Sequence, residues 1–382
     1  MNAVGFYVHI PFCQHKCIYC DFNSYPGQAA LFTPYLSAVR QEMAIVAPLL
    51  ANVRPPSCTL YVGGGTPTLL PAPDLGALIE TLRHIFSLAD DAETTVEANP
   101  GTVDVDGLRC LRASGVNRLS LGVQSFDDRL LRTLGRIHTA RGAQEAIRDA
   151  RLAGFTNLNL DLILGLPGQT LQNWQESVQA ALDASPPHLS LYALTVEEGT
   201  PLAASIAGGS LPAPDQDLAA DMYEWAAETL ERAGYVHYEI SNWALPGYAC
   251  QHNLLYWHNE PYIGLGAGAH SWWAGRRWAN LRLPAAYIAA LDAGQPPVAE
   301  QETVGRAQEI SETMIMGLRL LEEGVSFARF EARFGVSMHD VYAAEIAGLV
   351  ARGLLERTAD HIRLTRRGHL LGNQAFAQFL PD

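Results

Sequence analysis

The sequence has no long uninterrupted apolar run and no excess of positive charge. Because no stretch of about 18 apolar residues occurs, we expect no membrane-spanning helix and no membrane insertion. The formal net charge is -14, and Lys16 is the one lysine among 26 basic residues. Nucleic-acid binding depends on clustered basic side chains, so nucleic acid is not an expected partner either.

The first residues also lack the pattern of a secretory signal, because no basic segment followed by an apolar stretch precedes Cys13. We therefore expect a cytoplasmic location, where thiols stay reduced. Six cysteines in that compartment favour metal binding or chemistry over disulfides. With 382 residues, of which 48% are hydrophobic, the chain is predicted to fold throughout, as a large domain and a smaller one.

Short apolar runs alternate with helical segments over the first half of the chain. The runs are typical of strands buried on both faces and lie at 6–10, 59–62, 94–98, 118–123, 158–164 and 189–194. Helical segments lie between them at 34–50, 74–88, 139–153 and 170–183. This alternation predicts parallel βαβ units in an α/β fold, arranged as an open (β/α)6 partial barrel.

The pattern changes beyond residue 200. A Pro- and Gly-bearing stretch (199–214) precedes a helix at about 216–233 and an aromatic, Gly-rich region. The last segment is mostly helical, and the segment 353–368 contains two short strands around a turn, which suggests a winged-helix-like module. We predict three parts, namely a core barrel (1–235), a connecting region (236–300) and a C-terminal domain (301–382).

Unusual residues follow each predicted strand of the barrel. In strand order they are Cys13, Cys17 and Cys20, then GGGTP (63–67), then Glu97, Gln124, Asp161 and Tyr192. The C-terminal ends of the strands in a (β/α) barrel meet at one mouth, where active sites lie. We therefore expect these residues to form a single site.

The three cysteines have the spacing C-x3-C-x2-C, which one loop can bring together. A cubane [4Fe-4S] cluster normally takes four cysteines, so three leave one iron open. The amino and carboxylate groups of S-adenosylmethionine (SAM) can chelate that iron, which positions the sulfonium for reductive cleavage to methionine and a 5′-deoxyadenosyl radical. A structural zinc site with His9 or His15 as fourth ligand is the alternative.

These motifs make the sequence similar to the radical SAM superfamily, and within it to the group around oxygen-independent coproporphyrinogen III dehydrogenase. YVHIPFC, GGGTP, VEANPGT, GVQSF and DLILGLPGQT match that group in order and spacing. The resemblance covers nearly the whole chain and implies the following SAM-pocket residues: Tyr7, Gly64, Gly65, Thr66, Glu97, Gln124, Arg136 and Asp161. The alternative is that the glycines form a simple strand-to-helix turn and that Glu97 or Asp161 caps a helix.

Two features separate the close relatives within this group. The coproporphyrinogen enzymes carry a further cysteine two residues after the triad, where this chain has Phe22. HNLLYW (252–257) resembles the H-N-x-x-Y-W signature of the HemW-like haem chaperones, which bind haem and deliver it to respiratory proteins. That resemblance implies His252 as the axial haem ligand. His258 and Cys250 remain alternatives as ligand.

The resemblance thus implies a [4Fe-4S] cluster and SAM as cofactors, haem as cargo, and haem-accepting apoproteins such as respiratory enzymes as partners. A homodimer is also considered. An oxidoreductase that decarboxylates coproporphyrinogen III is the competing interpretation, and RNA modification is disfavoured by the charge. Cys58 and Cys110 are interpreted as small apolar side chains without a function.

Overall fold

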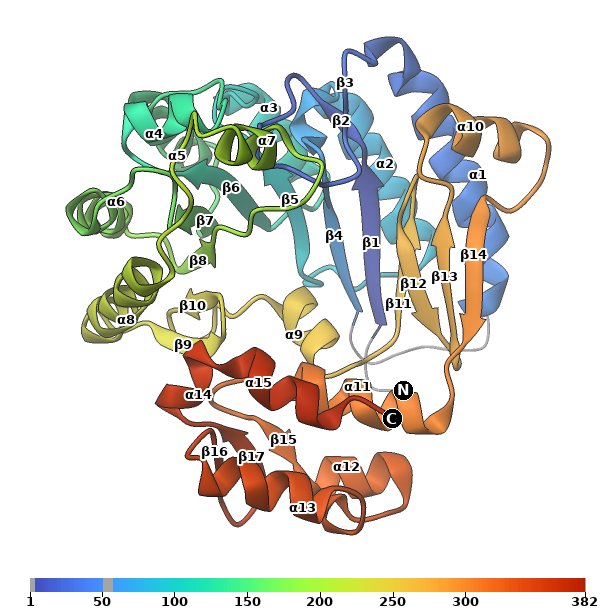
Figure 1. Ribbon diagram of the computed structural model, residues 1–382. Helices are drawn as coiled ribbons and strands as arrows, with labels where there is room; N and C mark the ends of the chain where they lie inside the picture. The colour runs from blue at the N-terminus through green and yellow to red at the C-terminus, as the bar shows by residue number, and fades with distance from the viewer. Residues whose placement is uncertain (1–3, 51–57, 382) are drawn as a thin grey trace.

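Parallel strands form the centre of the structure, and the predicted open (β/α)6 arrangement is confirmed (Figure 1). The computed structural model describes residues 4–50 and 58–381. The six strands expected from the apolar runs are β1 (Val4–Ile10), β4 (Cys58–Gly64), β5 (Thr94–Ala98), β6 (Arg118–Gln124), β7 (Asn157–Leu164) and β8 (His188–Ala193). Each pairs in parallel with the next. Their C-terminal ends point upward in Figure 1.

Helices cover the outer face of these strands (Figure 1). They are α1 (Phe32–Leu50), α2 (Ala72–Ile85), α3 (Val105–Ala113), α5 (Ala140–Leu152), α6 (Leu171–Asp183) and α8 (Gln216–Arg232). In α5 the buried residues Ala143, Ala146, Ile147 and Ala150 recur at helical spacing, so one stripe faces the sheet. None of the helices in the described residues is long and apolar enough to cross a membrane.

Residues 236–303 extend the same sheet at both edges. They form β9 (Val236–Glu239), β10 (Asn242–Ala244), β11 (Tyr262–Leu265), β12 (His270–Trp273), β13 (Arg276–Asn280) and β14 (Val298–Thr303). β11 lies parallel beside β1, and the others pair antiparallel. The sequence analysis predicted only a connecting region here, because these strands are short and β14 is exposed at every position, so they lack the long apolar runs of the central strands.

A buried carboxylate fastens this extension to the barrel. Glu42 of α1 is 2% exposed. It accepts hydrogen bonds from the Gly266 amide (2.8 Å), the Asn280 side chain (2.6 Å) and the Tyr287 hydroxyl (2.6 Å). Tyr287 belongs to α10 (Pro284–Asp292). One side chain therefore joins α1, the turn after β11, the end of β13 and α10.

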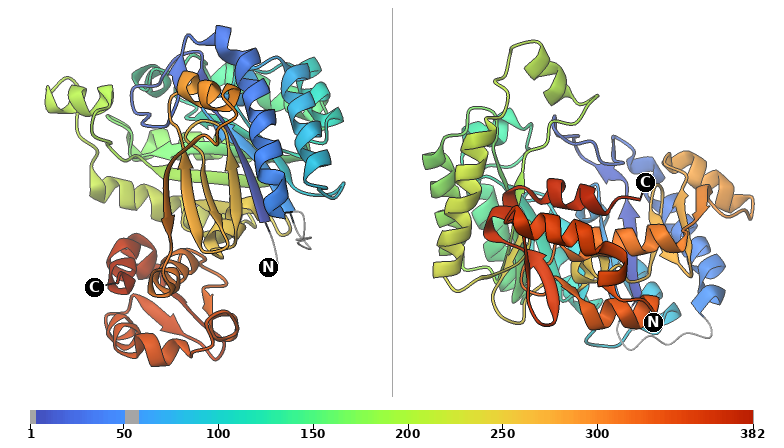
Figure 2. Two further views of the ribbon diagram at one scale, coloured as in Figure 1. Left: turned by 90° about the vertical axis from the view of Figure 1, so that its right-hand side faces the viewer. Right: turned by 60° about the horizontal axis from the view of Figure 1, so that its bottom comes forward.

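The C-terminal unit (residues 306–381) has a hydrophobic core of its own. Its elements are α11 (Arg306–Gly317), β15 (Val325–Ser326), α12 (Phe327–Phe334), α13 (Met338–Ala351), β16 (Leu355–Arg357), β17 (His361–Leu364), α14 (Arg366–Leu370) and α15 (Gly372–Phe376). Two helices followed by the β16–β17 hairpin give the expected winged-helix-like arrangement. Figure 2 shows this unit beneath the lower ends of the barrel strands. The boundaries at residues 235 and 300 stay predictions.

Burial raises the pKa of Glu42 to about 7, although its three hydrogen bonds oppose this shift. Between the ordinary carboxyl pKa and about pH 7, Glu42 is protonated in the folded chain but ionised in the unfolded chain. The protonated form therefore stabilises the fold at low pH, and this stabilisation is lost as the pH rises through about 7. We expect Glu42→Gln to flatten the decline of the unfolding free energy between about pH 5 and about pH 8. It should also cost about 1–3 kcal/mol at the lower pH, because an amide cannot satisfy all three donors.

Chemical denaturation at several pH values measures both effects. Glu80→Gln on α2 is the matched control, because Glu80 is exposed. An unchanged pH slope in the Glu42 variant would contradict the assignment.

Candidate functional site

A short loop carries the three cysteines above the upper ends of β1 and β4. It lies between β2 (Phe12–Cys13) and β3 (Tyr25–Pro26), which pair with each other. The Cys20 amide donates to the Cys17 carbonyl at 3.2 Å, and the Lys16 ammonium donates to the Phe22 carbonyl at 2.9 Å. These bonds turn the loop back on itself, so that the three thiols face one cavity.

This upper cavity has a volume of about 450 Å³. Its lining includes Cys13, Cys17, Cys20, Phe22, Tyr61, Gly64, Gly65, Thr66, Glu97, Asn99, Ser120, Gln124, Arg136, Asp161 and Tyr192. All of the expected SAM-pocket residues except Tyr7 are among them. Glu97, Asp161 and Tyr192 lie within β5, β7 and β8 and do not follow these strands as expected, but their side chains line the same cavity as the cysteine loop. SAM binding by them remains a proposal.

Two histidines were considered as the fourth ligand of a zinc site. His15 lines the upper cavity beside the three cysteines and stays open as that ligand. His9 is occupied on both ring nitrogens, by the Tyr7 hydroxyl (2.9 Å) and the Asn23 carbonyl (2.8 Å). A cubane cluster takes its thiolates on separate irons, so its ligands need not converge on one point.

Glycines are required after β4 because the cysteine loop passes so close. A Cβ atom on Gly64 would lie 2.5 Å from the His9 ring, and one on Gly65 would lie 2.5 Å from the Phe12 carbonyl and 3.0 Å from Cys13 Sγ. Gly64 also has φ +112°, a conformation that suits glycine. The resemblance assigned Gly64 and Gly65 to the SAM pocket. Their first effect is to admit the loop that carries the cysteines.

Two carboxyl groups line the cavity without a cationic partner. Glu97 accepts from the Tyr61 hydroxyl (2.8 Å) and the Gly64 amide (3.0 Å), and Asp161 accepts from Asn159 (2.7 Å). Neither forms an ion pair with any residue that the structure describes. Burial raises the pKa of Glu97 to about 7 and also raises the pKa of Asp161. Such groups fit a ligand that brings positive charge, as the ammonium and sulfonium of SAM do.

The opposite wall is shaped by Gln124 and Arg136. Gln124 has φ +65° beside a break in the β6–β7 register, a strained conformation that places its side chain at the cavity. Arg136 donates to the Asn99 side chain (2.5 Å) and the Gly122 carbonyl (2.6 Å). Its buried Nε has no hydrogen-bond partner among the described residues. The guanidinium is thus held in place with a donor to spare.

A second cavity of about 540 Å³ lies below the first. The lining of this lower cavity consists of Tyr7, Tyr61, Glu97, Tyr192, Glu239, Ser241, Asn242, His252, Asn253, Tyr256, Trp257, Tyr262, His270 and Arg319. Tyr61, Glu97 and Tyr192 also line the upper cavity, so the two are neighbours along the barrel interior. Tyr7, which the resemblance assigned to the SAM pocket, lies on the wall of the lower cavity.

His252 lies at the lower end of the barrel, away from the cysteines. It belongs to α9 (Gln251–Trp257), which Figure 1 places between the barrel and the C-terminal unit. The side chain is 1% exposed, with Nδ1 2.7 Å from the Thr59 hydroxyl and Nε2 3.0 Å from the Tyr256 hydroxyl. Burial lowers its pKa to about 3, so the ring is neutral.

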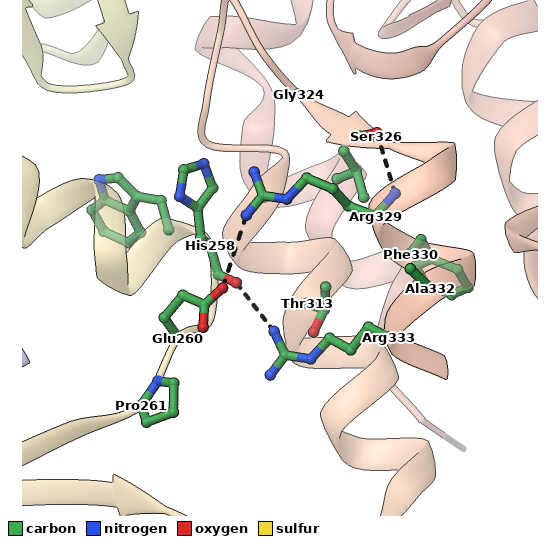
Figure 3. Close-up of a pocket in the computed structure, with 13 residues that line it drawn as sticks. His258, Glu260, Pro261, Thr313, Gly324, Ser326, Arg329, Phe330, Ala332 and Arg333 are labelled. Atoms are coloured by element: carbon green, nitrogen blue, oxygen red, sulfur yellow. Dashed lines mark hydrogen bonds and ion pairs between the residues drawn. The ribbon is translucent and has the colours of Figure 1, made fainter. Parts of the chain in front are cut away.

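Cys250 and His258, the two alternative haem ligands, are less available than His252 for binding iron. Burial raises the pKa of Cys250 to about 12, which keeps it a thiol. His258 lines a third cavity, between α9 and the C-terminal unit (Figure 3), and its Nε2 lies 2.9 Å from Glu323. Arg333 donates to the His258 carbonyl at 3.3 Å in the same view. These contacts make His258 part of the junction with the C-terminal unit.

The sequence analysis missed several polar residues inside the barrel. Arg118 is 1% exposed, and its positive charge opposes the upward pKa shifts of Glu97 and Asp161. Asn99 fixes Arg136, and Arg319 reaches the lower cavity from the C-terminal unit. A charged residue at the start of an otherwise apolar run was the available signal for Arg118. Nothing in the local sequence marks Arg319.

Comparison with known proteins identifies this arrangement. Residues 7–181 match the radical SAM superfamily, and residues 305–371 match the HemN C-terminal domain. The protein called heme chaperone HemW in Bacillus subtilis (strain 168) is 39% identical over 377 residues, which cover 98% of this chain and 99% of that protein. The chain belongs to the HemW family of radical SAM proteins. Membership implies a [4Fe-4S] cluster and SAM.

Further relatives agree with HemW family membership. The heme chaperone HemW of Escherichia coli (strain K12) is 38% identical over 392 residues, covering 100% of this chain and 99% of that protein. Among solved structures, coproporphyrinogen III oxidase (HemN) from Escherichia coli has a TM-score of 0.85 at 26% identity, over 99% of this chain and 90% of that one. The fold is therefore common to both kinds of relative.

The cysteine loop predicts iron loss on substitution. Anaerobically reconstituted wild-type protein should hold roughly four irons and four sulfides per chain, and Cys17→Ala should reduce both to background. Iron and labile-sulfide assays measure the change. Cys110→Ala on α3, outside the cavity, is the control and should keep the cluster. Tight zinc without labile sulfide in the wild type would refute this assignment.

The upper cavity predicts weaker SAM binding when a polar lining residue is removed. Asp161→Ala or Gln124→Ala should weaken binding about tenfold or more, because each substitution deletes a hydrogen-bonding group that faces the ligand. Calorimetry on cluster-loaded protein measures the affinity. Asp183→Ala, at the exposed end of α6, should have no effect. Unchanged affinity in both cavity variants would show that SAM binds elsewhere.

Proposed function

We propose that this chain is a haem chaperone of the cytoplasm. It holds a [4Fe-4S] cluster on Cys13, Cys17 and Cys20, binds SAM in the upper cavity, receives haem in the lower cavity and passes it to apoproteins such as respiratory enzymes. The observation that carries the proposal is the lower cavity, which combines flat aromatic walls with imidazole groups and a cation directly beneath the cluster site. The cluster and SAM together would supply one-electron cleavage of the sulfonium.

The composition of the lower cavity suits a metalloporphyrin. Rings from Tyr256, Tyr262 and Trp257 offer apolar faces to a flat macrocycle. The guanidinium of Arg319 lies 4.3 Å from the Trp257 ring and 3.6 Å from Glu239, and its buried Nε has no hydrogen-bond partner in the described part of the chain. An arginine with a free donor can pair with a carboxylate such as a haem propionate.

His252 is the ligand that the HNLLYW motif suggests, and its surroundings allow this role after one rearrangement. The Thr59 hydroxyl fixes the ring through Nδ1, as a supporting group does for many metal-binding imidazoles. The ring is neutral, which iron ligation requires. For Nε2 to bind iron, the Tyr256 hydroxyl must first release it.

Phe22 supports the choice of cargo binding over porphyrin synthesis. Its side chain is 64% exposed and lines the upper cavity. A phenyl ring offers no sulfur and no exchangeable proton at the position where the coproporphyrinogen enzymes have a cysteine. A reaction that needs this thiol therefore has no group to perform it here.

Coproporphyrinogen III decarboxylation is the second candidate function. It is favoured by the close match in fold to coproporphyrinogen III oxidase (HemN) from Escherichia coli, with a TM-score of 0.85. The same two cavities would then hold SAM and a reduced tetrapyrrole. A homodimer is compatible with either function. Size-exclusion chromatography tests whether it forms.

We expect the anaerobically purified protein to bind haem and to leave coproporphyrinogen III unconverted in the presence of SAM and a reductant. His252→Ala should weaken haem binding about tenfold or more, whereas Tyr256→Phe should strengthen it severalfold, because it removes the hydroxyl that competes for Nε2. Absorption titrations with haem measure both affinities. His84→Ala on the exposed face of α2 is the control.

Two results would contradict this proposal. Stoichiometric formation of protoporphyrinogen IX would establish the oxidase function instead. Unchanged haem affinity in both His252→Ala and Tyr256→Phe would remove His252 from the haem site, even if the protein binds haem.

A further inference from the structure

Two histidines line the lower cavity, and they differ in their freedom to bind a metal. His252 is buried with both ring nitrogens hydrogen-bonded. His270, at the start of β12, is exposed, and its ring has no hydrogen-bond partner among residues 4–50 and 58–381. We propose that His270 is a ligand of the haem iron in the lower cavity. This inference rests on the proposed function and adds a ligand that HNLLYW does not contain.

The chain presents His270 on the inner wall through a tight turn after β11. Gly266 (φ +99°) and Gly268 (φ +76°) form this turn in conformations that favour glycine. Gly264 brings the two strands together, since a Cβ atom there would lie 2.1 Å from the His270 carbonyl oxygen. The sequence GLGAGAH therefore encodes a hairpin that ends with an imidazole beside the cavity.

This hairpin is anchored on both sides, so the imidazole is carried by a rigid element. His270 pairs with Ala279 of β13, and the Asn280 amide donates to the Ala269 carbonyl at 2.9 Å. From the cysteine loop, the side chain of Asn23 donates to the Ala267 carbonyl at 3.0 Å. A metal ligand on a fixed strand is already in position, so binding does not lose the conformational entropy that ordering a mobile loop would cost.

The neighbouring histidines His9 and His188 already use both ring nitrogens in hydrogen bonds. His9 is hydrogen-bonded to the Tyr7 hydroxyl and the Asn23 carbonyl. His188 is fully buried between Asn159 and Tyr238. Either would have to lose an existing hydrogen bond before it could bind iron, as His252 would. His270 makes no hydrogen bond to the described residues, so it can bind iron without breaking a contact within the protein.

The test is the absorption spectrum of bound haem in anaerobically purified, full-length protein. His270→Ala should shift the Soret band and weaken haem binding about tenfold or more, because an iron ligand is replaced by solvent. Added imidazole should restore the wild-type spectrum of His270→Ala, since the truncated side chain leaves room for it. His270→Gln serves as a second variant of similar size, and His339→Ala on the exposed face of α13 is the matched control.

The outcomes separate this inference from the proposed function. Haem binding by the wild type, with unchanged spectrum and affinity in folded His270→Ala and His270→Gln, would overturn the assignment of His270 and leave the chaperone proposal in place. Failure of the wild type to bind haem would overturn both. A shifted spectrum that imidazole restores in His270→Ala, together with an unchanged His339→Ala, would establish His270 as a ligand.

Discussion

The pairing of β1 on both of its edges is the constraint on which the rest of the structure depends. β1 lies parallel to β4 on one side and to β11 on the other. Its upper end leads directly into the cysteine loop, and its lower end packs on α9, where a Cβ atom on Gly5 would lie 3.1 Å from the His252 ring. β1 therefore leads into the cysteine loop of the upper cavity at one end and contacts the helix of His252 at the other, and Tyr7 between them lies on the wall of the lower cavity.

Charge inside the barrel is the second determinant of the site. Glu97 and Asp161 are carboxyl groups whose pKa values rise because they are buried, and Arg118 supplies an opposing positive charge in the same interior. Burying such groups costs free energy unless partners or ligands compensate it. Arg118 and the hydrogen bonds to both carboxyl groups offset part of that cost.

The parallel strands and the upper cavity were predictable from the sequence, because strands buried on both faces leave continuous apolar runs and their ends share one mouth. The position of His252 was not predictable. It depends on Thr59 and Glu93, which contact α9 from distant parts of the chain. Strands β9 to β14 were missed because each has only three to six residues, and because β14, which is exposed at every position, has no apolar pattern to detect.

Asn23 connects the cysteine loop to the β11–β12 hairpin through hydrogen bonds. Its side-chain amide donates to the carbonyls of Ala267 and Arg282, and its own carbonyl is bonded by His9. A displacement of the loop has to break these bonds or carry the hairpin with it. The position of the cysteine loop and the position of the hairpin that carries His270 are therefore coupled.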